Sequence, residues 1–137
     1  MQVRGSELLT DIFGFWPSFH DAEVVRIALE RTLPFEDGPH LLADIHTFEM
    51  TKEVDSDGYH ILRHHVVVSF RFGGVDQLQL EGFNNQNVVF GLSIEPIDEG
   101  QNDGFRYEVK FEASYGIGAN FMCRDVCIET VRPWTPD

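Results

Sequence analysis

The sequence predicts an α+β domain in which a short N-terminal helix packs on a mainly antiparallel sheet, strongly curved or folded into two layers. Three observations lead to this fold class. A helical pattern occurs only before residue 15, the segments after Pro17 follow the two-residue period of strands, and short turns rich in glycine and aspartate separate these segments. The 137 residues suit a single domain, which we take as 1–137.

The helix is expected between Ser6 and Gly14. Ser6 is suited to the N-terminal cap, and Gly14 can end the helix in the left-handed conformation. The apolar residues of this segment fall on one helical face: Leu8, Leu9, Ile12 and Phe13.

Seven strands are expected after the helix. Their ranges are 25–29, 41–50, 59–72, 78–80, 88–94, 105–111 and 121–131. Asp55-Ser56-Asp57-Gly58 suits a type I turn with Gly58 in the left-handed region, which would close the second and third strands into a hairpin.

The expected hairpin also sets a pairing register. If the numbers of facing residues sum to 114, Met50 faces His64 and His46 faces Val68. Even-numbered positions would then form the apolar face: Leu42, Phe48, Leu62, Val66, Val68, Phe70 and Phe72. His46, His64 and Met50 would point into the same face.

The composition limits the function classes. The formal charge is −13, and only two of the ten basic residues are lysines, so the basic surface that a phosphate backbone requires is missing. Plentiful aromatic residues argue against disorder. The longest uncharged stretch, 82–94, is far shorter than the ~20 apolar residues of a membrane span, and the N-terminus has no signal-peptide pattern. We therefore expect a cytoplasmic protein that binds neither nucleic acid nor membrane.

The acidic residues concentrate in two segments, 36–57 and 95–112. One interpretation is solvated loops that keep the protein soluble. The other is an electronegative face that steers a basic partner. The candidates for steering are Asp55, Asp57, Asp98, Glu99 and Asp103.

No catalytic or metal-binding motif is recognisable. Cys123 and Cys127, on one extended strand, would lie ~13 Å apart and stay reduced. The six histidines form no zinc-binding spacing, and no nucleophile or phosphate-loop motif accompanies them. His20 and Asp21 could form an acid–base pair, but neighbours on a strand point to opposite faces unless the turn bends. We expect no metal, no cofactor and no enzymatic activity.

Two polar, glycine-containing segments stand out. The run Gly82-Phe83-Asn84-Asn85-Gln86-Asn87 holds four consecutive carboxamides, which either tie their own loop together or offer adaptable donors and acceptors to a partner. Tyr115-Gly116-Ile117-Gly118 has the same two interpretations, its glycines allowing a tight bend.

An ordered set of four segments resembles the immunity protein 50 family of bacterial polymorphic toxin systems. It consists of Trp16-Pro17-Ser18-Phe19-His20-Asp21-Ala22-Glu23-Val24, Phe48-Glu49-Met50-Thr51, the carboxamide run extended to Val88, and the 115–118 segment. The similarity spans roughly residues 13–131. It implies a small cytoplasmic protein that binds a cognate toxin domain and blocks it, without cofactor or chemistry, and it assigns no contact residue.

We therefore interpret the chain as a non-enzymatic inhibitor of a toxin. From the negative charge of the chain we extrapolate that this toxin is a nuclease. The candidate partner-binding residues are Trp16, Phe19, His20, Asp21, Asn84, Asn85, Gln86 and Asn87, with the five steering acids. For Trp16 and Phe19 the alternative is core packing.

Two other functions remain open. A metal or hydrolytic enzyme would bring His20, Asp21, His46 and His64 within ~4–5 Å of one another. A ligand-binding domain would hold an apolar cavity of about 300 Å³ or more with a few polar groups.

Overall fold

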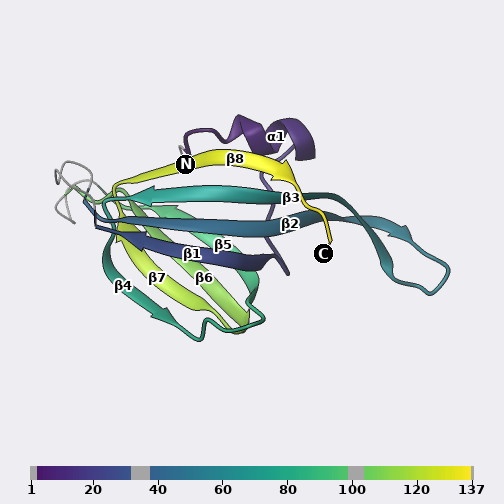
Figure 1. Cartoon of the computed structure of the whole chain (residues 1–137). Coiled ribbons are helices and arrows are strands. Elements are labelled where there is room, and N and C mark those ends of the chain that lie inside the picture. Colours follow the sequence, from purple (N-terminus) through teal and green to yellow (C-terminus); the bar gives the residue numbers. More distant parts are fainter. Residues whose placement is uncertain (1–2, 32–37, 99–103, 137) are drawn as a thin grey trace.

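A computed structural model describes residues 3–31, 38–98 and 104–136, which form one helix and eight strands (Figure 1). The helix is α1 (Glu7–Phe13). The strands are β1 (Glu23–Glu30), β2 (His40–Val54), β3 (His60–Gly73), β4 (Asp76–Glu81), β5 (Val88–Pro96), β6 (Tyr107–Tyr115), β7 (Gly118–Cys123) and β8 (Asp125–Pro133). The expected mainly antiparallel sheet with one short helix is confirmed.

All eight strands join one sheet in the order β4-β7-β6-β5-β1-β2-β3-β8, with antiparallel neighbours throughout. β1 and β5 meet through a single residue pair, Glu23 and Val88, at one end of the strands. The sheet thus consists of two four-stranded halves linked at one corner, and Figure 1 shows β4, β7 and β6 running beneath β1, β2 and β3.

The core lies between these two halves. Phe72 of β3 is five places from β7 in the strand order, yet its ring lies 5.1 Å from that of Phe121 and 6.2 Å from that of Phe111 on β6. Strands spaced ~4.8 Å apart in a flat sheet would hold the ring of Phe72 about 24 Å from that of Phe121 and about 19 Å from that of Phe111. The fully buried phenylalanines therefore pack across the molecule, from one half onto the other.

The helix packs beside β8. The backbone N–H of Arg4 donates to Val126 and its carbonyl accepts from Ile128, which extends the sheet edge just before α1. Gly14 ends the helix with a φ of 81°, as expected, and Leu9 and Phe13 are buried. Ser6 makes no side-chain capping bond. Two residues of the predicted apolar face, Leu8 and Ile12, are 40% and 38% exposed, because the short helix buries only a narrow stripe.

The predicted hairpin register is wrong over most of its length. Its turn forms as expected, with Gly58 at φ 85° and Val54 opposite His60. Two irregularities then change the pairing, so that Met50 faces Leu62 and His46 faces Val67. One is a bulge that sets His64 and His65 opposite Phe48, with His64 at φ 57°.

The shifted register moves β2 to the other face. Odd-numbered β2 residues now pair with even-numbered β3 residues on the buried side: Leu41, Ala43, Ile45 and Thr47 with Phe72, Phe70, Val68 and Val66. A one-residue slip exchanges the faces of a strand. Leu42 and Phe48 are consequently only half-buried, Leu62 is 39% exposed, and His64 and Met50 are exposed rather than inside.

The segment expected as one strand, 121–131, is two strands. β7 pairs with β6 and β4, whereas β8 pairs with β3, so the chain crosses between the halves at Arg124. The backbone N–H of Arg124 donates to the carbonyl of Gly73 at this crossing. Both cysteines are free, as expected, and burial raises the pKa of the Cys123 thiol to about 12.

Candidate functional site

The turn before β1 is bent by two residues with positive φ. Phe19 and Asp21 have φ values of 62° and 61°, and the Ala22 N–H donates to the Phe19 carbonyl. This bend brings the neighbouring side chains of His20 and Asp21 to 3.6 Å between Nε2 and Oδ2. In a straight strand, neighbouring side chains point to opposite faces, but the bend at this turn lets His20 and Asp21 approach each other.

Phe19 is a core residue. Its side chain is 1% exposed, and its ring lies 5.7 Å from that of Phe70 and 5.8 Å from that of the half-buried Trp16, which also contacts Phe70. Phe19 therefore has no surface to offer a partner, which corrects its selection as a contact residue. The core-packing alternative holds because the bent turn points this ring inward.

His20 and Asp21 are exposed on the surface next to β5. His20 Nδ1 donates to the Phe90 carbonyl at 3.0 Å, and its ring stacks on that of Phe90, which is 55% exposed. The Asp21 N–H donates to the carbonyl of Val89. The turn is thus fixed to the start of β5 by backbone and side-chain bonds together.

The carboxamide run ties itself together at two of its four members. Asn87 is 4% exposed; its Oδ1 accepts from the N–H groups of Asn84 and Ile117, and its Nδ2 donates to the Asn84 carbonyl. Asn84 Oδ1 accepts from the Gln86 N–H. Asn87 is therefore a structural residue, and the exposed side chains of Asn85 and Gln86 remain available to a partner.

The two polar segments noted in the sequence pack against each other. A Cβ on Gly116, whose φ is 74°, would collide with the Gln86 carbonyl and Asn87 Oδ1, and one on Gly82 would collide with the Gly116 carbonyl. Glycine is required at both positions because the two loops approach backbone to backbone. The bond from Ile117 to Asn87 joins them.

These features share one end of the molecule. The Val24 N–H donates to the Asn87 carbonyl, and Glu23 pairs with both Val88 and His46. The turn at 16–21, the carboxamide loop and the middle of β2 therefore lie side by side.

The steering acids do not form one face. Asp55 and Asp57 occupy the hairpin tip, beyond the end of β2, whereas Asp98 follows β5 at the end where β2 begins. Asp55 also works within its turn, because its Oδ1 accepts from the N–H groups of Asp57 and Tyr59. Glu99 and Asp103 lie outside the described residues.

A groove of about 230 Å³ separates the N-terminal turn from β2. Its wall on the turn side includes Phe15, Pro17 and His20, and its wall on β2 includes Phe48 and Met50. Phe15 is 52% exposed and Met50 48%. Sequence reasoning missed this groove, because it depends on a register that the hairpin irregularities determine.

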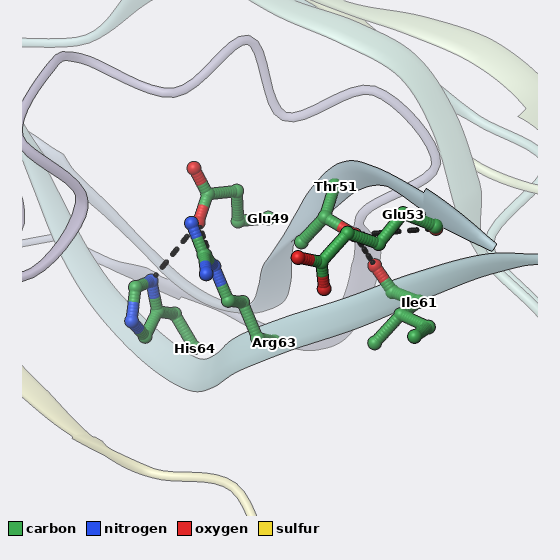
Figure 2. A network of polar contacts seen from close by, with 6 residues as sticks. All are labelled: Glu49, Thr51, Glu53, Ile61, Arg63 and His64. Atoms are coloured by element: carbon green, nitrogen blue, oxygen red, sulfur yellow. Dashed lines mark hydrogen bonds and ion pairs between the residues drawn. The ribbon is translucent and has the colours of Figure 1, made fainter. Parts of the chain in front are cut away.

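Glu49, which also lines this groove, is the centre of an ionic network shown in Figure 2. Its Oε1 accepts from Arg63 Nε at 2.6 Å and lies 3.2 Å from His64 Nδ1. The hydrogen bond from Arg63 lowers the pKa of the Glu49 carboxyl, and it raises the pKa of the Arg63 guanidinium in return. The network fixes the base of the hairpin.

The hairpin projects beyond this base, as Figure 1 shows. β2 pairs with β1 only up to His46, and β3 pairs with β8 only from Val66 onward. We call residues 50–62 the projecting hairpin. Its exposed apolar side chains were also missed from the sequence: Met50, Val54, Tyr59, Ile61 and Leu62. The sequence did contain a signal for the projection. The expected strands 41–50 and 59–72 are much longer than the expected strand 25–29, so a hairpin made of them must extend past it.

His46 and His65 form a separate cluster with Trp134. His46 Nε2 and His65 Nδ1 share a hydrogen bond of 3.0 Å, and Trp134 stacks on His46 with ring centroids 4.2 Å apart. Burial lowers the pKa of His46, and the neighbouring His65 lowers it further. His46 is paired with His65, His20 with Asp21, and His64 with Glu49, so the convergence that an enzyme hypothesis requires is not observed among them.

No group of three or more His, Cys, Asp or Glu side chains in the described parts of the chain could hold a metal ion. The hollows that reach the volume expected of a ligand-binding domain include two along β4, of about 610 and 450 Å³. A third, of about 330 Å³, is lined by residues of β1, β2, β3 and β8. All three are open to solvent, however, whereas small-molecule sites bury most of the ligand surface.

The chain was compared with known proteins and with models of protein families. No curated protein and no solved structure matches the chain. Among the described residues, the helical content offers no segment long and apolar enough to cross a membrane. The family model for immunity protein 50 matches residues 5–134, a range that includes the bent turn, the hairpin and the carboxamide loop. The chain belongs to the immunity protein 50 family.

Proposed function

We propose that the protein binds a cognate toxin domain in the bacterial cytoplasm and neutralises it without catalysis. The observation that carries this proposal is the family match over residues 5–134. An inhibitor acts by covering its target with a standard interface, about 800 Å² on each partner. Such an interface needs exposed anchors and charge complementarity, and it needs no catalytic constellation.

The net charge supports a basic target. A toxin that cleaves nucleic acid needs a positively charged cleft for its polyanionic substrate. A partner with a formal charge of −13 reaches such a cleft faster than a neutral one and competes with the substrate for the same surface. A nuclease is therefore the toxin class that we propose.

The accessible members of the sequence-predicted set are the contact candidates that remain. Apart from the acids, they are Trp16, His20, Asp21, Asn84, Asn85 and Gln86, which gather at the hairpin end of the molecule. An exposed imidazole, a carboxylate and three carboxamides supply donors and acceptors for a polar rim. Phe19 and Asn87 are not part of this contact surface because both are buried.

Co-expression tests the proposal. The C-terminal domain encoded immediately upstream is expressed in a host with and without this protein, and growth and complex formation are measured at ~150 mM salt. We expect arrested growth with the domain alone, and rescued growth with a complex that survives gel filtration when this protein is present. A toxin domain from an unrelated system is the control and should not be rescued. Arrest that persists, with no complex, would refute the assignment for that pair.

A further inference from the structure

The projecting hairpin is a two-stranded ribbon with unpaired edges. The β1 ladder stops at His46 and the β8 ladder at Val66, so residues 50–62 have strand partners only within the hairpin. At ~3.3 Å per residue, the distance from Thr47 to Val54 carries the tip about 20 Å beyond the sheet. A ribbon of this length can reach into a cleft of a partner, which a flat sheet surface cannot do.

Its surface is unusually apolar for a solvated element. Tyr59 is 72% exposed, Val54 56% and Met50 48%, and Ile61 and Leu62 are close to 40%. Isolated exposed apolar residues need no explanation, but five on one short ribbon suggest a binding element. Tyrosine is also among the residues that contribute most to binding in interface centres.

The hairpin is nevertheless held in one conformation. Asp55 Oδ1 accepts two backbone N–H groups at the tip, and Thr51 Oγ1 donates to the Ile61 carbonyl at 2.7 Å (Figure 2). His60 Nδ1 donates to the Thr51 carbonyl at 2.8 Å. An isolated two-stranded hairpin is only marginally stable in water. These bonds lower the entropy cost of ordering it on a partner.

The charge of the hairpin selects the chemistry of the partner. It carries three carboxylates, from Glu53, Asp55 and Asp57, against the single ammonium of Lys52. The apolar side chains lie among these acids. A complementary surface therefore combines basic side chains with apolar or aromatic walls, which is the composition of a cleft that binds the phosphates and bases of a nucleic-acid strand.

We propose that residues 50–62 are the inhibitory element and insert into a basic, apolar-walled cleft of the toxin domain. This inference rests on the proposed function. Tyr59 and Val54 supply the anchor, Glu53 and Asp57 the complementary charge, and the groove at the hairpin base receives the rim of the cleft.

The test compares two pairs of variants that differ in position. Val54→Ala/Tyr59→Ala removes the exposed anchor, and its control Val25→Ala/Leu29→Ala removes exposed apolar area from β1, outside the hairpin. Binding to the toxin domain from the rescue experiment is measured by surface plasmon resonance. We expect the anchor variant to raise Kd about 100-fold, mainly through faster dissociation, and the control to change it less than about threefold.

The charge variants use the same design. Glu53→Lys/Asp57→Lys reverses the hairpin charge, and Glu95→Lys/Glu112→Lys makes the same change at exposed positions on β5 and β6. We expect about a tenfold slower association for the hairpin pair and a smaller effect for the control. Thermal unfolding of every variant, compared with the original protein, identifies any that fail to fold.

The outcomes separate the two proposals. If the original protein neutralises the toxin domain and both folded hairpin variants bind as tightly as it does, the inference is overturned and the proposed function stands. If the original protein does not bind, both fall for that pair. If the anchor variant instead converts a homodimer to a monomer with unchanged toxin affinity, a second copy of this chain occupies the hairpin, and the inference is again overturned.

Discussion

Asn87 is a buried polar residue whose hydrogen bonds hold the loop that exposes Asn85 and Gln86. Its carboxamide makes three hydrogen bonds while 4% exposed, to Asn84 in its own loop and to Ile117 in the neighbouring one. Carboxamides match backbone groups in this way because they donate and accept at once. The loop conformation that presents Asn85 and Gln86 therefore depends on Asn87.

We predict that Asn87→Ala lowers the free energy of unfolding by about 2–3 kcal/mol. The change leaves the N–H groups of Asn84 and Ile117 without their acceptor, the latter in the buried interior. Urea denaturation followed by circular dichroism measures the loss. Asn85→Ala, in the same loop but exposed, is the matched control and should change stability by less than about 0.5 kcal/mol. Equal losses in the two variants would show that the bonds of Asn87 are not what holds the loop.

The sequence showed which segments are unusual, but it did not show which of their residues are structural and which are exposed to a partner. The carboxamide run and the glycine turn were both recognisable, but only the folded chain places Asn87 within reach of Ile117, thirty residues away. Phe19 could not be assigned to core or surface, because its direction depends on a positive φ that its residue type does not favour. Long-range contacts decided both cases.

At the scale of elements, the turn of the hairpin was predictable and its register was not. Asp55 to Gly58 carries a local signal that the structure confirms. The register depends on a bulge at His64 and His65 and on a second irregularity between Met50 and Val54. The bulge has no strong local signal, since any residue other than glycine is uncommon in the left-handed region, even histidine, which adopts it more often than most. A register error of one residue was enough to reverse the predicted burial of β2.

We predict that Asp55→Ala loosens the hairpin tip without unfolding the domain. The variant loses the acceptor of the Asp57 and Tyr59 N–H groups, and the tip can open alone because its strands pair only with each other. Hydrogen exchange of the backbone amides at 57–59 should become at least about tenfold faster. Amide exchange in β5 and β6, in the other half of the sheet, should stay as it was.

Asp57→Ala is the matched control for the tip. It removes an exposed carboxylate of equal charge whose side chain bonds neither of these amides, and its exchange should resemble that of the original protein. If Asp55→Ala also speeds exchange in β5 and β6, the hairpin and the body of the sheet unfold as one unit. The hairpin would then not be an independent element.

At the scale of the whole molecule, the fold places its candidate contacts at one end and divides its acids between both. The hairpin tip and Asp98 lie at opposite ends of the sheet. A net charge of −13 therefore acts at long range as a field of the whole molecule, whereas the hairpin supplies contact. The net charge can be counted from the sequence alone. The distribution of the acids between the two ends could be seen only once the order of the strands was known.

This division leads to the prediction that salt acts on association rather than on dissociation. Raising sodium chloride from ~50 to ~500 mM shortens the Debye length to a few ångströms, which removes steering but leaves short-range packing in place. We expect the association rate with the toxin domain to fall at least about tenfold, and the dissociation rate to change less than about threefold. Stopped-flow fluorescence, using Trp16 and Trp134 as internal probes, measures both rates across the salt range.

A flat association rate would contradict the steering role and would also remove the charge argument for a nuclease target. The rate at high salt would then already be the basal rate of docking, set by the orientation of the two surfaces. A strong dependence in dissociation, with association unchanged, would instead place the important ion pairs inside the bound complex. The charge effect would then come from ion pairs of the three hairpin acids, Glu53, Asp55 and Asp57, and not from the long-range field of all 23 acids.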